Sequence, residues 1–364
     1  MILNPSRLVV ARKRRGLSRV GLAKASGLAV RSLTYYESAK VQPSEPAVRA
    51  LAQALDFPEK FFYGPDIEEP SSSGSNFRAL STMTARQRDA ALAVGAIAIE
   101  FSKWMDRRFE LPKPTVPDLY GFRDAEAAAR AVRAQWGLGE RPINNVVHLL
   151  EAHGVRVFSL PIDSSNVDAF SVWHQGVPFV FLNQSKSAER LRMDVCHELG
   201  HLALHKKQGR PGRRQAELEA NRFASAFLVP ADDLLACVPR GLFLTTVHRM
   251  KVRWGISAIG LVHRLRALDL LTEWQYRTLC IEISKEGGRR TERDGTIRDN
   301  SQVLTKVLGM LRDDGITQGT IADDLSLNPS ELEGLLHGLT ITSIGGGRHG
   351  SKTQAPSKTH LRIV

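Results

Sequence analysis

Two histidines four residues apart, with a glutamate beside the first, are the residues whose types and spacing most directly suggest chemistry. They are His197, Glu198 and His201, in the segment DVCHELGHLALH. On an α-helix, residues i and i+4 share one face about 6 Å apart, so both imidazoles can bind one tetrahedral zinc ion. Glu198 is then beside the first ligand, placed to act as general base on a water molecule at the metal. The spacing predicts a catalytic zinc site, with Glu198 as the catalytic residue.

A catalytic zinc ion needs a third protein ligand. The candidates near the two histidines have a carboxylate, thiol or imidazole group and are Asp194, Cys196, His205, Glu217 and Glu219. His205 is disfavoured, because on a continuous helix it lies about 12 Å along the axis from His197. Asp194 and Cys196 are disfavoured because they point away from the face that carries the two histidines.

Glu217 is the favoured third ligand. It lies in a second predicted helix, 214–228, in which Asn221 follows four residues later on the same face and can orient a ligating histidine. Two histidines and one glutamate form the open ligand set of hydrolytic zinc enzymes. Glu219 faces away from Glu217 and is the second choice.

The hydrophobic pattern places this site in a domain of mixed structure. Short runs of β-branched and aromatic residues, VRVFSL, AFSVW and VPFVFLN, predict the strands of a small sheet. Helical periodicity precedes them in AEAAARAVRAQWG and INNVVHLLEAHG. It returns at 187–205 and 214–228 and continues through several helices at 231–283. We therefore expect an α+β domain of the zincin type.

The segment from AFSVW through HELGHLALH, followed by ELEANRFASAFLVP, resembles the ImmA/IrrE family of bacterial metallopeptidases. The resemblance extends from about residue 126 to residue 271. It implies zinc binding by His197, His201 and Glu217, with Glu198 as the base. It also implies cleavage of a DNA-binding repressor protein.

This sequence departs from the family pattern at Asp194 and Cys196, where small or hydroxyl residues are usual. Neither position takes part in the chemistry, so the implied metal site is left intact.

Basic residues are concentrated at the N-terminus. The net charge is +12, and residues 1–60 contain eleven Lys/Arg against four Asp/Glu, a local excess of 11 − 4 = +7. Such an excess favours an anionic partner, most often a nucleic acid. The run at residues 12–15 is expected to add sequence-independent attraction to phosphates.

The segment GLSRVGLAKASGLAVRSLTYYESAK has the layout of a helix-turn-helix. Ser18 can cap the first helix, Gly27 supplies the turn, and a second helix begins near Ala29. The expected outward face of this recognition helix, which meets base edges in double-stranded DNA, consists of Val30, Arg31, Thr34 and Tyr35. Arg19 and Ser32 are placed for phosphate contacts.

Residues 7–63 resemble the Xre/Cro-type helix-turn-helix family, through the pattern RL…AR…GLS…LA…SGL, the mid-helix Glu37 and P…LAQALDF…FF. Ala29 stands where a capping serine is common, and Ala39 stands where glycine is common. These departures weaken local capping and leave the recognition surface in place.

The whole chain is therefore expected to be multidomain and mainly α-helical. The predicted parts are 1–66 (helix-turn-helix bundle), 67–83 (linker), 84–118 (connecting helix), 119–283 (peptidase domain), 284–300 (linker), 301–340 (helical, helix-turn-helix-like segment) and 341–364 (disordered basic tail). Within the helix-turn-helix-like segment, residues 313–339 include six Asp/Glu and no Lys/Arg. An acidic face is a poor partner for DNA, so this segment is predicted to make packing or protein contacts.

The cysteine content and the hydropathy of the sequence indicate in which cellular compartment the protein is expected. The chain has three widely spaced cysteines, and its longest apolar run, at 90–99, is far shorter than the about 20 residues that a membrane span needs. These features predict a cytoplasmic protein without disulfide bonds or a membrane partner.

Two functions remain open on these observations. The first is a DNA-binding transcriptional regulator with a zinc-dependent endopeptidase domain, whose protein substrate is a repressor, an antitoxin or a neighbouring copy of this chain. The second is a non-proteolytic regulator or antitoxin whose zinc domain is a sensor or scaffold. Glu198 argues against the second, since a structural site needs no base.

A zinc-dependent nucleic-acid enzyme is the least favoured function. A homodimer is the default expectation, because helix-turn-helix proteins often bind two half-sites.

Overall fold

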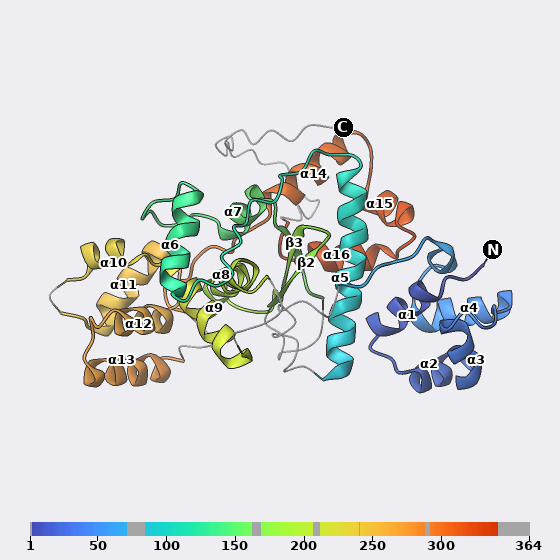
Figure 1. The fold of residues 1–364 in the computed structure, drawn as a ribbon, viewed down its shortest axis with the longest axis horizontal. Coiled ribbons are helices and arrows are strands. Elements are labelled where there is room, and N and C mark those ends of the chain that lie inside the picture. Colours follow the sequence, from blue (N-terminus) through green and yellow to red (C-terminus); the bar gives the residue numbers. More distant parts are fainter. Residues whose placement is uncertain are drawn as a thin grey trace, which may run out of the picture.

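The computed structural model describes residues 2–70, 84–161, 169–206, 212–239, 241–287 and 292–340. These residues are mainly helical and include one small sheet (Figure 1), which confirms the predicted fold class. The N-terminal bundle consists of α1 (Pro5–Arg14), α2 (Arg19–Ser26), α3 (Val30–Glu37), α4 (Glu45–Leu55) and the 3-10 helix η1 (Glu59–Tyr63). Ser18 caps α2 by accepting a hydrogen bond from the Gly21 amide, and Gly27 makes the turn before α3 with φ of 72°.

The long helix α5 (Ala85–Asp106) is more than a connection between two domains. Its N-terminus has a capping box formed by Thr84 and Gln87, and most of its side chains from 90 to 105 are buried. Figure 1 shows α5 standing between the N-terminal bundle and the sheet. It packs on α1 on one side, and its Phe101 lies 5.9 Å from the ring of Phe158 in the sheet on another. Because α5 is apolar on several faces, the bundle and the sheet share one core with it.

The sheet consists of β1 (Arg156–Ser159), β2 (Ala169–His174) and β3 (Val177–Leu182), in the order β1-β3-β2. These match the three predicted strands. β3 pairs parallel to β1 and antiparallel to β2. Gln175 and Gly176 both have positive φ in the two-residue turn between β2 and β3, as tight hairpins require.

Eight helices complete the central region. They are α6 (Ala125–Gln135), α7 (Val146–Ala152), α8 (Ala188–Leu204), α9 (Arg213–Leu228), α10 (Ala231–Cys237), α11 (Leu244–Trp254), α12 (Ala258–Ala267) and α13 (Glu273–Lys285). α8 packs against α9 and against β2. Helix α7 is capped by His153, and the next residue, Gly154, turns the chain with φ of 79°. An added Cβ at Gly154 would lie 2.3 Å from the backbone of Lys113. Only glycine fits there.

The C-terminal helices α14 (Gln302–Asp313), α15 (Gln318–Asp324) and α16 (Pro329–Leu336) lie against both of the other regions. The buried Glu151 carboxylate of α7 accepts hydrogen bonds from the Ser301 hydroxyl and from the first amides of α14. The buried Glu331 of α16 pairs with Arg14 and Arg15 of the N-terminal bundle, at 2.7 and 2.6 Å. The acidic segment therefore makes intramolecular packing contacts, in agreement with the role predicted from its charge.

Residues 292–300, in the predicted second linker, have no helix or strand but are closely attached to the central region. Asp299 pairs with the buried Arg192 at 2.8 Å, and Glu189 accepts a hydrogen bond from the Thr296 amide at 2.6 Å. The linker expected at 67–83 lies outside the described residues from 71 onwards, and so does the whole tail expected at 341–364. No helix among the described residues is both long and apolar enough to cross a membrane.

Candidate functional site

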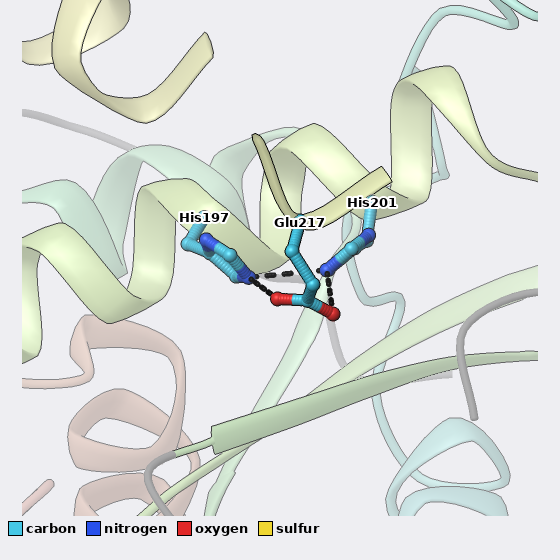
Figure 2. Close-up of side chains that lie close together, drawn as sticks. All are labelled: His197, His201 and Glu217. Atoms are coloured by element: carbon cyan, nitrogen blue, oxygen red, sulfur yellow. Dashed lines mark hydrogen bonds and ion pairs between the residues drawn. The ribbon is translucent and has the colours of Figure 1, made fainter. Parts of the chain in front are cut away.

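The structure brings together the side chains of His197 and His201 on α8 and of Glu217 on α9. The two Nε2 atoms lie 3.1 Å apart. Glu217 Oε2 lies 3.3 Å from Nε2 of His197, and its Oε1 lies 3.6 Å from Nε2 of His201. Figure 2 shows the two rings and the carboxylate pointing toward one common point.

This geometry fits a zinc ion. Ligand atoms around tetrahedral zinc, at bond lengths of about 2.0–2.1 Å, lie roughly 3.3 Å from one another. The three separations here, 3.1, 3.3 and 3.6 Å, are close to that value. Moreover, Glu217 Oε1 is buried and has no hydrogen-bond partner among the described residues. A buried carboxylate oxygen without a partner is costly, and a metal ion at the common point would satisfy it.

Glu198 lies beside this cluster and is almost completely buried. Its Oε2 accepts a hydrogen bond of 2.6 Å from the Ser171 hydroxyl of β2. Burial raises the pKa of Glu198 to about 7, against the opposing effects of His197 and the Ser171 hydrogen bond. A carboxyl group with a pKa near neutrality can both accept and return a proton, as general acid–base catalysis requires. Ser171 was not predicted, although it is the only polar residue in the run AFSVW.

The three clustered side chains influence each other's protonation. Burial lowers the pKa of His201 to about 4, so this imidazole is neutral at pH 7 and its lone pair is available. The two imidazoles beside the Glu217 carboxylate lower its pKa. Burial also acts to lower the pKa of His197, but the hydrogen bond to Glu217 and the nearby carboxylates outweigh it and raise the pKa. A metal ion at this point would displace the proton from His197.

The other candidate ligands lie elsewhere. Asp194 pairs with Arg190 at 3.0 Å, and Cys196 is fully buried, which raises the pKa of its thiol and keeps it protonated. His205 and Glu219 contact each other at 3.0 Å and are not part of the three-residue cluster.

Gly200 brings the two helices of the site together. A Cβ at this position would lie 3.2 Å from the Cα of Ala220 and 3.1 Å from the ring of Phe223, both on α9. Because a backbone atom cannot rotate away, a larger residue would push α9 and Glu217 outward.

We expect Gly200→Ala to lower the free energy of unfolding by about 1–3 kcal/mol, the usual cost of overpacking. Denaturant unfolding measures this change. Gly309→Ala in α14 is the matched control, because its added Cβ meets nothing within 4 Å. There the substitution should stabilise the helix by about 0.5–1 kcal/mol. Equal effects of the two substitutions would contradict the close-approach argument.

The predicted recognition helix is α3. Val30, Arg31 and Thr34 are exposed and Tyr35 is half-buried, whereas Leu33 is buried in the bundle. The Arg31 guanidinium donates a hydrogen bond of 2.8 Å to the Tyr35 hydroxyl. Ser32 is partly exposed. The N-cap position, Ala29, provides no side-chain hydrogen bond, as its residue type implies.

Several basic side chains of the bundle are paired within the chain. The buried Glu37 carboxylate binds Arg12 and Arg19, although the side chain of Arg19 remains about half exposed (49%). Lys13 pairs with Glu69. Together with the Glu331 pairs, these contacts engage every side chain of the run 12–15. These pairs reduce the positive charge of the run without cancelling it, because Glu331 is shared by two arginines and Glu37 is shared with Arg19. The attraction of this run to DNA phosphates therefore stays a prediction.

Comparison with known families agrees with this structure in two regions. Residues 6–60 match the family model described as a helix-turn-helix domain. Residues 150–266, which include the His197/His201/Glu217 cluster, match the model described as an IrrE N-terminal-like domain, of the peptidase family M78. A search of curated proteins found no match. The chain therefore joins an N-terminal helix-turn-helix domain to a central IrrE-like domain of the M78 peptidase family.

Proposed function

We propose that this protein is a DNA-binding transcriptional regulator whose central domain is a zinc-dependent endopeptidase acting on a repressor or antitoxin protein. The observation that carries the proposal is the convergence of His197, His201 and Glu217 on one point, beside the buried carboxyl group of Glu198. Two imidazoles and one carboxylate leave a fourth coordination position open, as catalytic zinc sites do.

The roles of the side chains follow from this arrangement. His197, His201 and Glu217 would hold the zinc ion. A bound zinc ion supplies Lewis acidity, which acidifies a water molecule and polarises the scissile carbonyl. Glu198 takes the proton of the attacking water and returns it to the leaving amine nitrogen. The Ser171 hydroxyl holds the Glu198 carboxyl group during this exchange.

We propose that α3 binds the major groove of double-stranded DNA. Val30, Arg31, Thr34 and Tyr35 would face the bases, and Ser32 would contact a phosphate. Arg19 can contribute its exposed part to a phosphate while it remains paired with Glu37. Two copies bound to adjacent half-sites would form a homodimer.

A second function is a regulator without proteolysis, in which the metal domain is a sensor or scaffold. One observation favours it: the Glu198 carboxylate is almost completely buried and hydrogen-bonded to β2. The predicted effect of Glu198→Gln, given in the Discussion, distinguishes the two functions.

The metal site is tested by zinc content. Wild-type protein dialysed in metal-free buffer should retain about one zinc ion per chain, measured by elemental mass spectrometry. Glu217→Ala should retain little, because two imidazoles alone bind zinc weakly. Glu333→Ala, which removes an exposed carboxylate of α16, is the control and should retain the wild-type amount. A folded wild-type protein without zinc would exclude the proposed peptidase.

The DNA-binding surface is tested with a duplex selected by the wild-type protein from a random-sequence pool. Arg31→Ala should weaken binding by about tenfold, the lower range for loss of one base contact. Arg277→Ala removes the same charge from the exposed face of α13 and should leave the affinity nearly unchanged. Affinities at two salt concentrations are compared by fluorescence anisotropy. Similar losses in both variants would mean that net charge, and not α3, determines binding.

A further inference from the structure

The ring of His201 makes a contact on the side opposite the metal cluster. Its Nδ1 lies 2.9 Å from Nδ1 of His205, and Nε2 of His205 lies 3.0 Å from Glu219 Oε2. The other oxygen of Glu219 accepts a hydrogen bond of 2.9 Å from Gln215. His205 is only 2% exposed, so a buried chain of polar groups connects His201 to a carboxylate on α9.

Metal binding at the His197/His201/Glu217 cluster determines which nitrogen carries the proton in each ring of the series His201–His205–Glu219. If Nε2 of His201 is to bind a metal ion, its lone pair must point to the cluster, and the single ring proton is on Nδ1. That N–H then donates to Nδ1 of His205. His205 in turn carries its proton on Nε2, which donates to the Glu219 carboxylate.

If these hydrogen bonds ran in the opposite direction, from His205 to His201, the arrangement would be incompatible with metal binding. It would place the proton of His201 on Nε2, only 3.1 Å from Nε2 of His197 and inside the cluster. It would also direct the unprotonated Nε2 of His205 toward the Glu219 carboxylate, which also has only lone pairs. When His205 is neutral, Glu219 therefore favours, through it, the one tautomer of His201 that can bind a metal ion.

The geometry points to His205 and Glu219 as positioning residues for the proposed zinc site: they fix the tautomer and ring orientation of His201 and raise its affinity for the metal. This inference rests on the proposed function, because it takes His201 Nε2 as a ligand. Carboxylates that accept hydrogen bonds from ligating histidines make the imidazole a stronger ligand, and their loss typically weakens metal binding 10–100-fold. Here the carboxylate acts through a second histidine.

The two ligating histidines are supported in different ways. Nδ1 of His197 lies 3.0 Å from Oδ1 of Asn221, which is a neutral acceptor on the exposed side of α9. His201 is connected instead to a negative charge through a buried ring. The stronger support thus falls on His201, whose side chain is 1% exposed, and the weaker on His197, at 15%.

The end of α8 makes this connection geometrically feasible. The helix ends at Leu204, and His205 is its C-cap, with φ of −121° and ψ of 30°. The His205 amide still donates a hydrogen bond of 3.0 Å to the His201 carbonyl. Because helical residues i and i+4 share one face, the ring of His205 lies beside that of His201.

The test is the zinc dissociation constant of the full-length protein, measured by competition with a chromophoric chelator. Three substitutions separate a hydrogen-bonding role from a packing role. His205→Phe keeps the ring volume without hydrogen bonds. His205→Gln can accept a hydrogen bond from His201 and donate one to Glu219, and Glu219→Ala removes the charge at a partly exposed side chain.

We expect His205→Phe and Glu219→Ala to raise the dissociation constant about 10–100-fold and His205→Gln to raise it less. The variant with both His205→Phe and Glu219→Ala should have a dissociation constant no higher than that of His205→Phe alone, because both residues act through one series of hydrogen bonds.

The control is the pair His248–Glu286, which has the same chemistry, at 2.9 Å, far from the cluster in the sequence. His248→Phe should leave zinc affinity unchanged. If His205→Phe binds zinc as tightly as wild type, or more tightly than His205→Gln, the side chain only packs and the inference is wrong. Additive losses in the double variant would also overturn it. Failure of the proposed function is distinguishable, because the folded wild-type protein would then have no measurable zinc affinity.

Discussion

Glu198→Gln is expected to abolish peptide cleavage while leaving zinc content and DNA binding intact. The amide keeps the size of the side chain and can still accept the hydrogen bond from Ser171. It cannot take a proton from water, and the loss of a general base typically lowers the rate about 10²–10⁴-fold. The measurement is the number of new peptide N-termini, detected by mass spectrometry, in a proteome-derived peptide library incubated with the zinc-loaded full-length protein.

Glu333→Gln, at an exposed position of α16, is the matched control and should cleave like wild type. Cleavage at the wild-type rate by Glu198→Gln would place the base elsewhere. If the zinc-loaded wild-type protein yields no new N-termini, the non-proteolytic regulator is the better account of this chain.

Glu331→Gln is expected to release the C-terminal helices from the N-terminal bundle. The Glu331 carboxylate is 3% exposed and bonds both Arg14 and Arg15. Removal of one partner from a buried ion pair typically costs 3–5 kcal/mol, because the remaining charge is left without compensation. We expect about 3 kcal/mol here, since the two arginine side chains keep some contact with water. Amide hydrogen exchange should increase in α16 and in the C-terminal part of α1.

Glu333→Gln is again the control, because it removes the same charge from the exposed face of the same helix. Unchanged exchange in both variants would mean that other contacts suffice to hold the segment. Asn328 donates a hydrogen bond of 2.8 Å to the backbone of Asp56, and Lys60 pairs with Asp323 at 3.0 Å, so these would be the contacts to remove next.

The Glu331 contact also explains part of the charge distribution. The basic run at 12–15 contributes strongly to the N-terminal excess, yet its side chains face carboxylates from three parts of the chain. The exposed side chains of α3 take no part in these ion pairs, so the surface proposed to contact the bases does not compete with them.

Local features of the site and fold could be predicted from the sequence, because they depend on short-range geometry. Helical spacing places His197 and His201 on one face, whatever surrounds them. The three strands follow from short apolar runs with β-branched and aromatic residues, and the turn before α3 follows from the conformational freedom of Gly27. The same reasoning identified Glu217 ahead of Glu219, since only one of them shares a face with Asn221.

Contacts between distant segments were decided only by the tertiary structure. The role of His205 depends on the position of Glu219 on α9, which the spacing of the histidines does not encode. The partners of residues 12–15 lie up to 317 positions away in the chain. A charged side chain in a sequence is compatible with DNA, solvent or a carboxylate of the same protein. Only the packing of the folded chain selects among them, because the energy of a charge depends on which groups lie within a few ångströms and on how much water remains.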